Sequence, residues 1–160
     1  MASSNILIGN DAGNILKTGV RNIVIGTSAF DAADGTWDTT RSQYNIGIGA
    51  YALDGAMDDA TDNIAIGVEA LSGITHGDYN IGIGQDAGND IGDGESNILI
   101  GHLAGDAIVD TSNNIVIGSG AFGQSTNGHE NVVIGTSAGD DATDVGYAVI
   151  IGNGAGSGAL

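Results

Sequence analysis

Cysteine and proline are both absent from the 160 residues of this chain. Without cysteine the fold has neither disulfides nor thiolate metal sites, and without proline every backbone N–H can donate to a strand ladder. Aromatic residues are also scarce, at 4% of the chain, whereas glycine supplies 29 residues. Large rings therefore cannot fill a globular core, so small residues and isoleucine must fill it instead.

Positive charge is confined to the first quarter of the chain, at Lys17, Arg21 and Arg41, and the formal net charge is -17. Such a surface repels nucleic acids and anionic membranes, so we expect no nucleic-acid partner. The first five residues lack a basic segment followed by an apolar stretch, and no run of eighteen apolar residues occurs. We therefore expect neither an export signal nor membrane insertion.

A short unit, Asn-Ile-x-Ile-Gly, recurs along the whole chain and is mostly spaced by 17 residues. The nine copies, the last two of them variant, begin at Asn5, Asn22, Asn45, Asn63, Asn80, Asn97, Asn114, Asn131 and Ala148. When each copy is numbered from this first residue, position 4 is Ile, position 5 is Gly and position 8 is Ala in all nine. A fixed short period is typical of solenoids. The repeat predicts an all-β fold, a parallel β-solenoid of about nine 17-residue coils, as a single domain over residues 1–160.

Positions 2 to 4 of each copy show the two-residue alternation and the β-branched side chains of a strand. We predict that positions 2 and 4 point into the coil. The core candidates at position 4 are Ile8, Ile25, Ile48, Ile66, Ile83, Ile100, Ile117, Ile134 and Ile151. Gly at position 5 fits a corner with positive φ, Ala at position 8 fits a small inward site, and the apolar residues at position 12 suggest a second short strand.

Position 3 should then point outward, yet no copy carries a polar residue there. A strand that is apolar on both faces is buried on both faces, and in a narrow solenoid the second cover is most simply another copy of the chain. We therefore predict a homo-oligomer. The interface candidates are Leu7, Val24, Ala65, Leu99, Val116, Val133 and Ile150.

From Asn5 to Gly156, the unit Asn-Ile-x-Ile-Gly-x-x-Ala resembles the head repeats of trimeric autotransporter adhesins and similar repeats in bacteriophage tail fibres. The resemblance implies left-handed parallel β-rolls, three around one axis. No heptads of a coiled-coil stalk are present, so the phage relationship is favoured. It implies a non-enzymatic adhesive rod on the virion surface, a fibre or surface-appendage subunit for host attachment, with other virion or surface proteins at its ends. The alternative is the head fragment of a bacterial trimeric surface adhesin, at the cell surface.

The second coil is six residues longer than the 17-residue coils, which predicts a loop insertion near residues 31–44. This loop holds the only Trp of the chain, and its mixture of aromatic and charged residues is common in recognition surfaces. The alternative is that the Trp packs over the coil. The candidates for contact with a host glycan or surface receptor are Asp34, Trp37, Asp38, Arg41 and Tyr44.

Evidence for catalytic or cofactor chemistry is weak. Gly118–Gly123 matches a dinucleotide-binding glycine pattern, but no helix is expected after it, and His76, His102 and His129 fall at three different coil positions. No catalytic residue and no required cofactor are predicted. Ca²⁺ bridging adjacent coils and plain solvation remain two alternatives for the carboxylates in the turns. These are Asp31, Asp34, Asp58, Asp59, Asp62, Asp140, Asp141 and Asp144.

Overall fold

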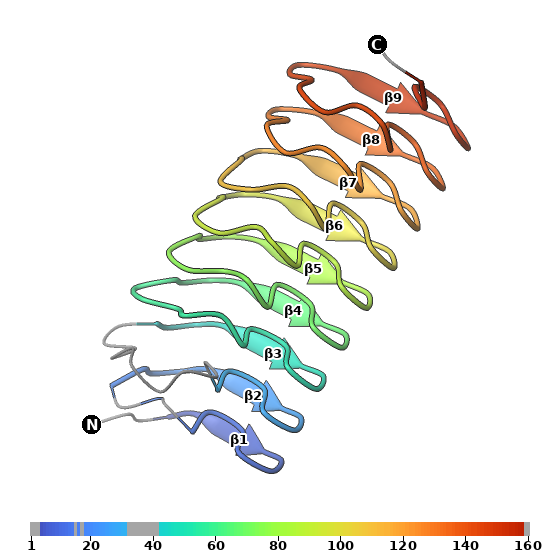
Figure 1. Ribbon diagram of the computed structural model, residues 1–160. Coiled ribbons are helices and arrows are strands. Elements are labelled where there is room, and N and C mark those ends of the chain that lie inside the picture. Colours follow the sequence, from blue (N-terminus) through green and yellow to red (C-terminus); the bar gives the residue numbers. More distant parts are fainter. Residues whose placement is uncertain (1–3, 15, 17, 32–41, 159–160) are drawn as a thin grey trace.

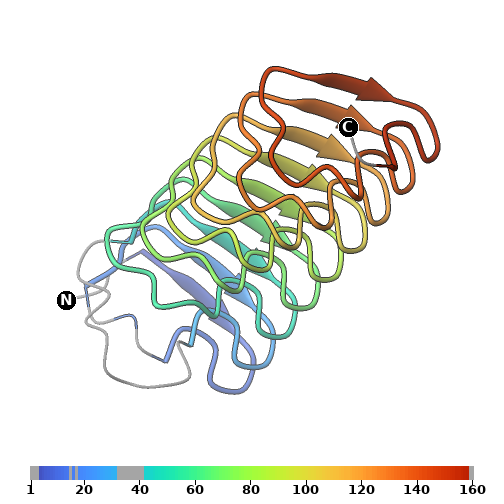
Figure 2. The same cartoon turned by 45° about the horizontal axis from the view of Figure 1, so that its top comes forward.

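The computed structural model describes residues 4–14, 16, 18–31 and 42–158. It contains nine strands of three residues each: β1 (Ile6–Ile8), β2 (Ile23–Ile25), β3 (Ile46–Ile48), β4 (Ile64–Ile66), β5 (Ile81–Ile83), β6 (Ile98–Ile100), β7 (Ile115–Ile117), β8 (Val132–Ile134) and β9 (Val149–Ile151). They form one parallel sheet in chain order, and no helix occurs in these described ranges. Figures 1 and 2 show the coils stacked as a rod, with β1 at one end and β9 at the other. The prediction of an all-β parallel solenoid is confirmed.

The strands stack in strict register, each residue opposite its equivalent one coil later. Ile6 lies opposite Ile23 at the start of the stack. The long second coil leaves this register intact, because Ile23 lies opposite Ile46. Backbone hydrogen bonds also link adjacent coils outside the strands: the Gly88 N–H donates to the Ala104 carbonyl at 3.0 Å. The ladder therefore continues around the corners of the coil.

Each strand ends after three residues because the glycine at position 5 turns the chain. All nine of these glycines have φ between 130° and 144°, a region that residues with a Cβ rarely enter. A Cβ on Gly101 would lie 2.6 Å from the carbonyl oxygen of Gly118 in the next coil. The invariant glycine thus allows both the turn and the close stacking of successive corners.

Positions 7, 9 and 17 also have left-handed backbone in every described coil, mostly at residues other than glycine. Examples are Asp86 at φ 55°, Phe122 at φ 54° and Tyr79 at φ 61°. Isolated non-glycine residues in this region carry local strain. The hydrogen bonds between coils hold the same conformation in place along the stack, so the corners recur with different side chains.

The two faces of the strands are the reverse of those predicted. Position 3 lies inside the coil: Val24, Ala65, Leu99, Val116 and Val133 are fully buried, and Ile150 is 8% exposed. Position 4 lies outside: Ile8, Ile48, Ile66 and Ile151 are 36–63% exposed, and Ile25, Ile83, Ile100, Ile117 and Ile134 are half-buried. The residues predicted to form the core therefore lie on the surface, and those predicted to form the interface lie in the core. Leu7 is 44% exposed because β1 lies at the end of the stack, where no coil covers it.

The reversal has a simple physical origin. Alternation along a strand decides which residues share a face, but it does not decide which face is interior. Position 1 has the same parity as position 3, and its asparagine side chains are buried from Asn22 to Asn131. The interior is also the side where side-chain size must match the opposite wall, and position 3 varies from Gly47 to Leu99.

Large and small residues alternate inside the rod to fill its narrow interior. A Cβ on Gly88 would lie 2.4 Å from a methyl of Leu99, and a Cβ on Gly82 would lie 2.7 Å from Leu71 Cγ. The predicted inward role of alanine at position 8 is confirmed, since this residue is fully buried from Ala29 to Ala138. Close packing of this kind is sensitive to changes of even one methylene group.

The second short strand predicted near position 12 does not form. Ile74, Ile91 and Ile108 at this position are fully buried, but the chain around them makes turns. Outside the nine strands, the described residues form only three isolated bridges: Val20 with Gln43, Gln43 with Thr61, and His129 with Gly146. The hydrophobicity of position 12 therefore indicates that it is buried, but it does not predict the backbone conformation there.

Candidate functional site

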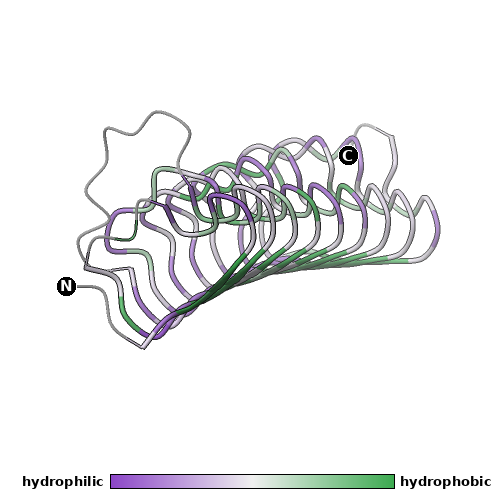
Figure 3. Cartoon of the chain, turned by 90° about the horizontal axis from the view of Figure 1, so that it is seen from below, coloured by the Kyte–Doolittle hydropathy of each residue, from purple (hydrophilic) through white to green (hydrophobic). Residues whose placement is uncertain are grey.

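A stripe of outward-facing isoleucines is the most extensive apolar surface of the rod. It consists of two columns, formed by positions 2 and 4 of the nine strands, and every residue in them is Ile except Val132 and Val149. Figure 3 shows that hydrophobic residues are concentrated along the strands of successive coils. We call the stripe the isoleucine face.

The isoleucine face is comparable in size with the biggest apolar patch on a typical monomer. Nine strands at about 4.8 Å, each three residues wide at about 3.3 Å per residue, give a flat footprint of roughly 400 Å². The corrugation of the side chains makes the accessible area larger. The biggest apolar patch on a typical monomer is about 300–600 Å² and is often functional. This surface is therefore the strongest candidate for an interface.

A row of buried asparagines runs along one border of the isoleucine face. Asn80 Oδ1 accepts hydrogen bonds from the backbone N–H and the Nδ2 of Asn97, both at 3.0 Å. Asn80 Nδ2 donates to the Gly94 carbonyl at 2.7 Å. Equivalent bonds link the asparagines of successive coils from Asn5 to Asn131. The side-chain amides of these asparagines hydrogen-bond to one another, so their role is to fix the corner where the strand begins.

The sequence prediction recognised the asparagine repeat but missed this ladder. A polar residue recurring next to an apolar strand has two explanations, an exposed binding row or a buried hydrogen-bonded row. The parity of position 1 with the apolar, size-variable position 3 was the signal that favoured burial. Buried polar groups must find partners, and stacked identical amides provide them.

Four of the predicted receptor-contact residues, Asp34, Trp37, Asp38 and Arg41, lie outside the described residues. The fifth, Tyr44, is 47% exposed at position 17 of the second coil. Its hydroxyl accepts a hydrogen bond from Arg21 Nη1 at 2.7 Å. The Arg21 guanidinium carbon also lies 5.4 Å from the Tyr44 ring centroid. Tyr44 is therefore held by the preceding coil while its ring remains accessible.

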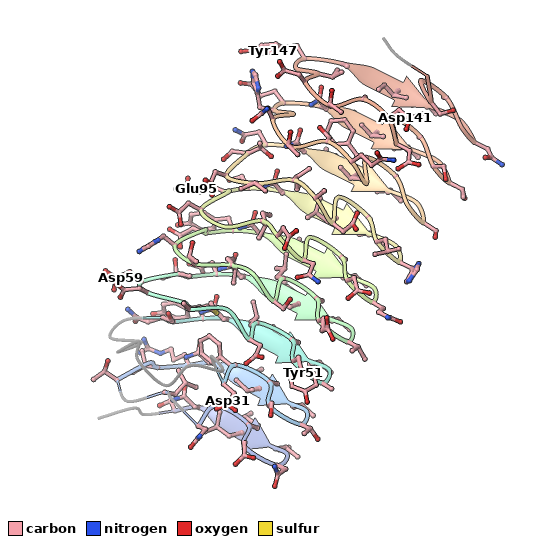
Figure 4. All side chains as sticks on the ribbon, viewed as in Figure 1. Asp31, Tyr51, Asp59, Glu95, Asp141 and Tyr147 are labelled. Carbon is pink, nitrogen blue, oxygen red and sulfur yellow. The ribbon has the colours of Figure 1, made fainter. Side chains whose placement is uncertain are left out.

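Two further tyrosines occupy the same corner column, which we call the position-17 edge. Tyr79 is 59% exposed and Tyr147 is 72% exposed. Figure 4 shows Tyr147, Glu95 and Asp59 along this side of the rod, whereas Tyr51 lies on the other side. The column is Ser4, Arg21, Tyr44, Asp62, Tyr79, Ser96, Asn113, Glu130 and Tyr147, and all nine have φ near 60°.

An open groove of about 610 Å³ lies beside the position-17 edge, between the turn at 109–113 and the turn at 126–130. Its polar lining includes Asp110, Ser112, Asn113, Thr126, Asn127, His129 and Glu130. Asp110 Oδ1 accepts the Asp93 N–H at 2.8 Å, and Ser112 Oγ accepts the Glu95 N–H at 3.0 Å. Bonds to the preceding coil therefore fix one wall of the groove.

His129 lines this groove, and Tyr147 of the next coil packs against the His129 ring from outside the lining. Their rings meet edge to face, with centroids 5.2 Å apart and planes at 82°. The Tyr147 N–H donates to the His129 carbonyl at 3.1 Å. A Cβ on Gly146 would lie 2.9 Å from the His129 ring, so the glycine makes room for it.

One pair of titratable side chains is linked on the same side of the rod. His76 Nδ1 lies 2.8 Å from Asp93 Oδ1. The hydrogen bond to Asp93 raises the pKa of His76, and bonds from Thr75 and His76 lower the pKa of Asp93. Both side chains are more than half exposed, so the pair adds little to stability.

The turn carboxylates do not assemble into a metal cage. Within the ranges that the structure describes, no three His, Cys, Asp or Glu side chains gather closely enough to hold an ion. Asp34 lies outside these ranges, and the other calcium candidates are spread along the rod. The pKa of Asp106 is raised by burial and, to a smaller degree, by Asp90, Asp140 and Asp86. Calcium is therefore not part of the function proposed below.

The groove and the isoleucine face thus offer two surfaces of opposite character, one polar and one apolar. The described part of the chain has no helix of the length and apolar character needed to cross a bilayer. In comparisons with known proteins, no family model matches the sequence, and no curated protein or solved structure matches it significantly.

Proposed function

We propose that the protein is a non-enzymatic adhesive rod that assembles as a homotrimer through its isoleucine face, and that it serves as a bacteriophage fibre or surface-appendage subunit for host attachment. The observation that carries the proposal is the continuous apolar stripe on the outside of an otherwise acidic rod. The repeat resemblance favours three left-handed rolls around one axis, located at the virion surface.

The free energy gained by removing apolar surface from water favours covering the isoleucine face. Removing about 400 Å² of apolar surface from water is worth about 10 kcal/mol per subunit at 25 cal/mol per Å². Association costs about 4–15 kcal/mol in lost freedom of motion. The stripe carries no charged residue, so subunits can approach there although three chains bring together three times -17 formal charge. Added salt screens this repulsion and should strengthen the assembly.

Trimerisation would also explain how weak contacts become useful adhesion. Three identical edges on one rigid rod present three copies of every surface site to the same host cell. Linked sites bind with an avidity well above that of one site, without any new contact. Other virion proteins would meet the rod at its ends, where the outer strands β1 and β9 leave unpaired edges.

The assembly is tested by sedimentation equilibrium of the purified chain. We expect about 47 kDa, three times the 15.8 kDa subunit. The double variant Ile83→Asp/Ile117→Asp places charges on the isoleucine face and should sediment as a monomer. The control is Thr136→Asp, which adds a charge at an exposed residue outside the strands. A wild-type monomer at micromolar concentration, or a trimer that survives the double variant, would refute the proposal.

Location and adhesion are tested separately. Mass spectrometry of purified virions should detect the protein, and the fluorescently labelled trimer should bind intact host cells. The same face would serve the head of a bacterial trimeric adhesin, and recovery in the bacterial surface fraction instead of virions would support that alternative. Failure to bind any bacterial cell, with the trimer intact, would remove the adhesive part of the proposal.

A further inference from the structure

We infer that the groove between residues 109–113 and 126–130 binds an uncharged oligosaccharide, with Tyr147 as its aromatic platform. This inference rests on the proposed adhesive function and names the class of ligand and the place where it binds. The volume of about 610 Å³ falls in the range of small-molecule sites. The groove is also offset from the isoleucine face, since its lining residues all lie outside the nine strands.

The charges around the groove exclude several other ligands. Asp110 and Glu130 line it, and the sequence has no Lys or Arg after residue 41. Phosphate, sulfate and carboxylate ligands would therefore meet negative charge without a counter-charge. An apolar ligand would leave the amides and hydroxyls of the lining without partners. Among ligands without positive charge, the remaining match is a neutral ligand that is rich in hydroxyl groups.

The donors and acceptors of the lining suit a sugar. The Glu130 carboxylate accepts from hydroxyls, and the Asn113 and Asn127 amides both donate and accept. Ser112 accepts the Glu95 N–H at 3.0 Å, so its own proton remains to be donated. Vicinal sugar hydroxyls act as donors and acceptors at once, so they pair with both kinds of group.

Tyr147, which lies beside the groove against His129, provides the apolar half of the proposed site. Tyr147 is 72% exposed although its position is held by the His129 ring and by the backbone bond to His129. A rigid, exposed tyrosine presents large amphipathic contact area at low entropic cost, and the C–H face of a sugar ring can pack on it. A cationic peptide would also suit the carboxylates, but it does not need a fixed aromatic platform.

The position-17 edge lets a longer saccharide continue beyond the groove. Tyr79 lies four coils before Tyr147 in the same column, which is roughly 19 Å along the rod. Both rings are more than half exposed. We therefore expect affinity to rise with the length of the saccharide until it reaches Tyr79.

Calorimetry with the assembled full chain tests the inference. The probes are cellohexaose, maltohexaose and the N-acetylglucosamine hexamer, with a heparin hexasaccharide and hexalysine as charged comparisons. At least one neutral probe should bind, and Tyr147→Ala and Glu130→Gln should each weaken that binding at least about tenfold, the loss expected for one good contact. The control Tyr51→Ala removes a tyrosine of 44% exposure on the other side of the rod and should change affinity less than about twofold.

The outcomes separate this inference from the proposed function. Circular dichroism and sedimentation mass of each variant show whether the rod is intact. Binding only to hexalysine or heparin, no binding of any neutral probe, or equal losses in the Tyr51 and Tyr147 variants would overturn the saccharide site. If cell binding survives periodate oxidation of the host surface but is lost after protease treatment, the adhesive function stands and the ligand is a protein.

Discussion

Truncating neighbouring residues on the two faces of β6 tests the exchange of core and surface most directly. Leu99 points into the coil and is fully buried, whereas the next residue, Ile100, faces outward and is half-buried. Leu99 fits between two glycines: a Cβ on Gly88 would lie 2.4 Å from one of its methyls, and a Cβ on Gly105 would lie 3.0 Å from the other. The backbone on both sides is held by the ladder, so the site cannot collapse.

Leu99→Ala should therefore lower the free energy of unfolding by about 3–5 kcal/mol, in the upper part of the range for buried Leu→Ala changes. Ile100→Ala should cost the coil itself only about 1 kcal/mol, since part of this side chain is already in water. Its larger effect should be on association, because the face of every subunit loses the same contact.

Urea denaturation followed by circular dichroism, at two protein concentrations a hundredfold apart, separates the two effects. Leu99→Ala should shift both curves to lower urea, and sedimentation in the absence of urea should still give the wild-type mass. Ile100→Ala should make the curves depend more strongly on protein concentration. A cost below about 1 kcal/mol for Leu99→Ala, together with a larger cost for Ile100→Ala at the low concentration, would refute the assignment of faces.

Three further changes probe the ladder, the corners and the acidic turns. Asn97→Ala leaves the buried N–H of Asn114 without its acceptor and should cost about 3 kcal/mol or more by urea denaturation. Gly101→Ala forces a Cβ to within 2.6 Å of a carbonyl oxygen at φ 134°, and should lower the melting temperature more than any exposed substitution. Asp106→Asn should raise stability at pH 7, because burial raises the pKa of the native carboxyl and wild-type stability falls as pH rises from about 3.8 through that pKa.

Each of these changes has a matched control. Asn153→Ala removes an exposed asparagine, and an equal cost there would contradict the ladder argument. Gly120→Ala has φ 62° and no foreign atom closer than 3.6 Å to the new Cβ, so it should cost only about 1 kcal/mol. For Asp106→Asn, the gain should disappear below pH 3, where both states are protonated. A variant less stable than the wild type at pH 7 would show that the carboxylate makes a favourable contact.

The sequence was sufficient for the repeat, the strand at positions 2 to 4 and the corner at position 5, because each depends on local residue type. Gly at position 5 and Ala at position 8 are constant, and their roles follow from steric size. The interior face was not predicted correctly, since Ile100 and Leu99 are equally apolar and alternation is symmetric between the two sides. Only the burial of Asn97 beside Leu99, together with the size match between Leu99 and Gly88, breaks that symmetry.

The groove could not be predicted for a different reason. Its residues occupy coil positions 13 to 17, where the nine copies differ more than at positions 1 to 8. The site forms because Gly146 has no Cβ, which leaves space for the His129 ring to pack against Tyr147. Such a local coincidence of three residues in two coils leaves no periodic signal. The loop around Trp37 was the more visible anomaly in the sequence, although it lies outside the described residues.

The direction of the backbone ladder determines how the rod responds to force. The hydrogen bonds join one coil to the next, so they lie parallel to the long axis, as in the bond from Gly88 to Ala104. Tension applied at the two ends therefore peels the coils away one after another instead of shearing many bonds at once. Each 17-residue coil that opens lengthens the chain by roughly 50 Å. A single-molecule pulling trace should show a series of equal low-force steps, so the rod lengthens gradually under load and does not fail in one event.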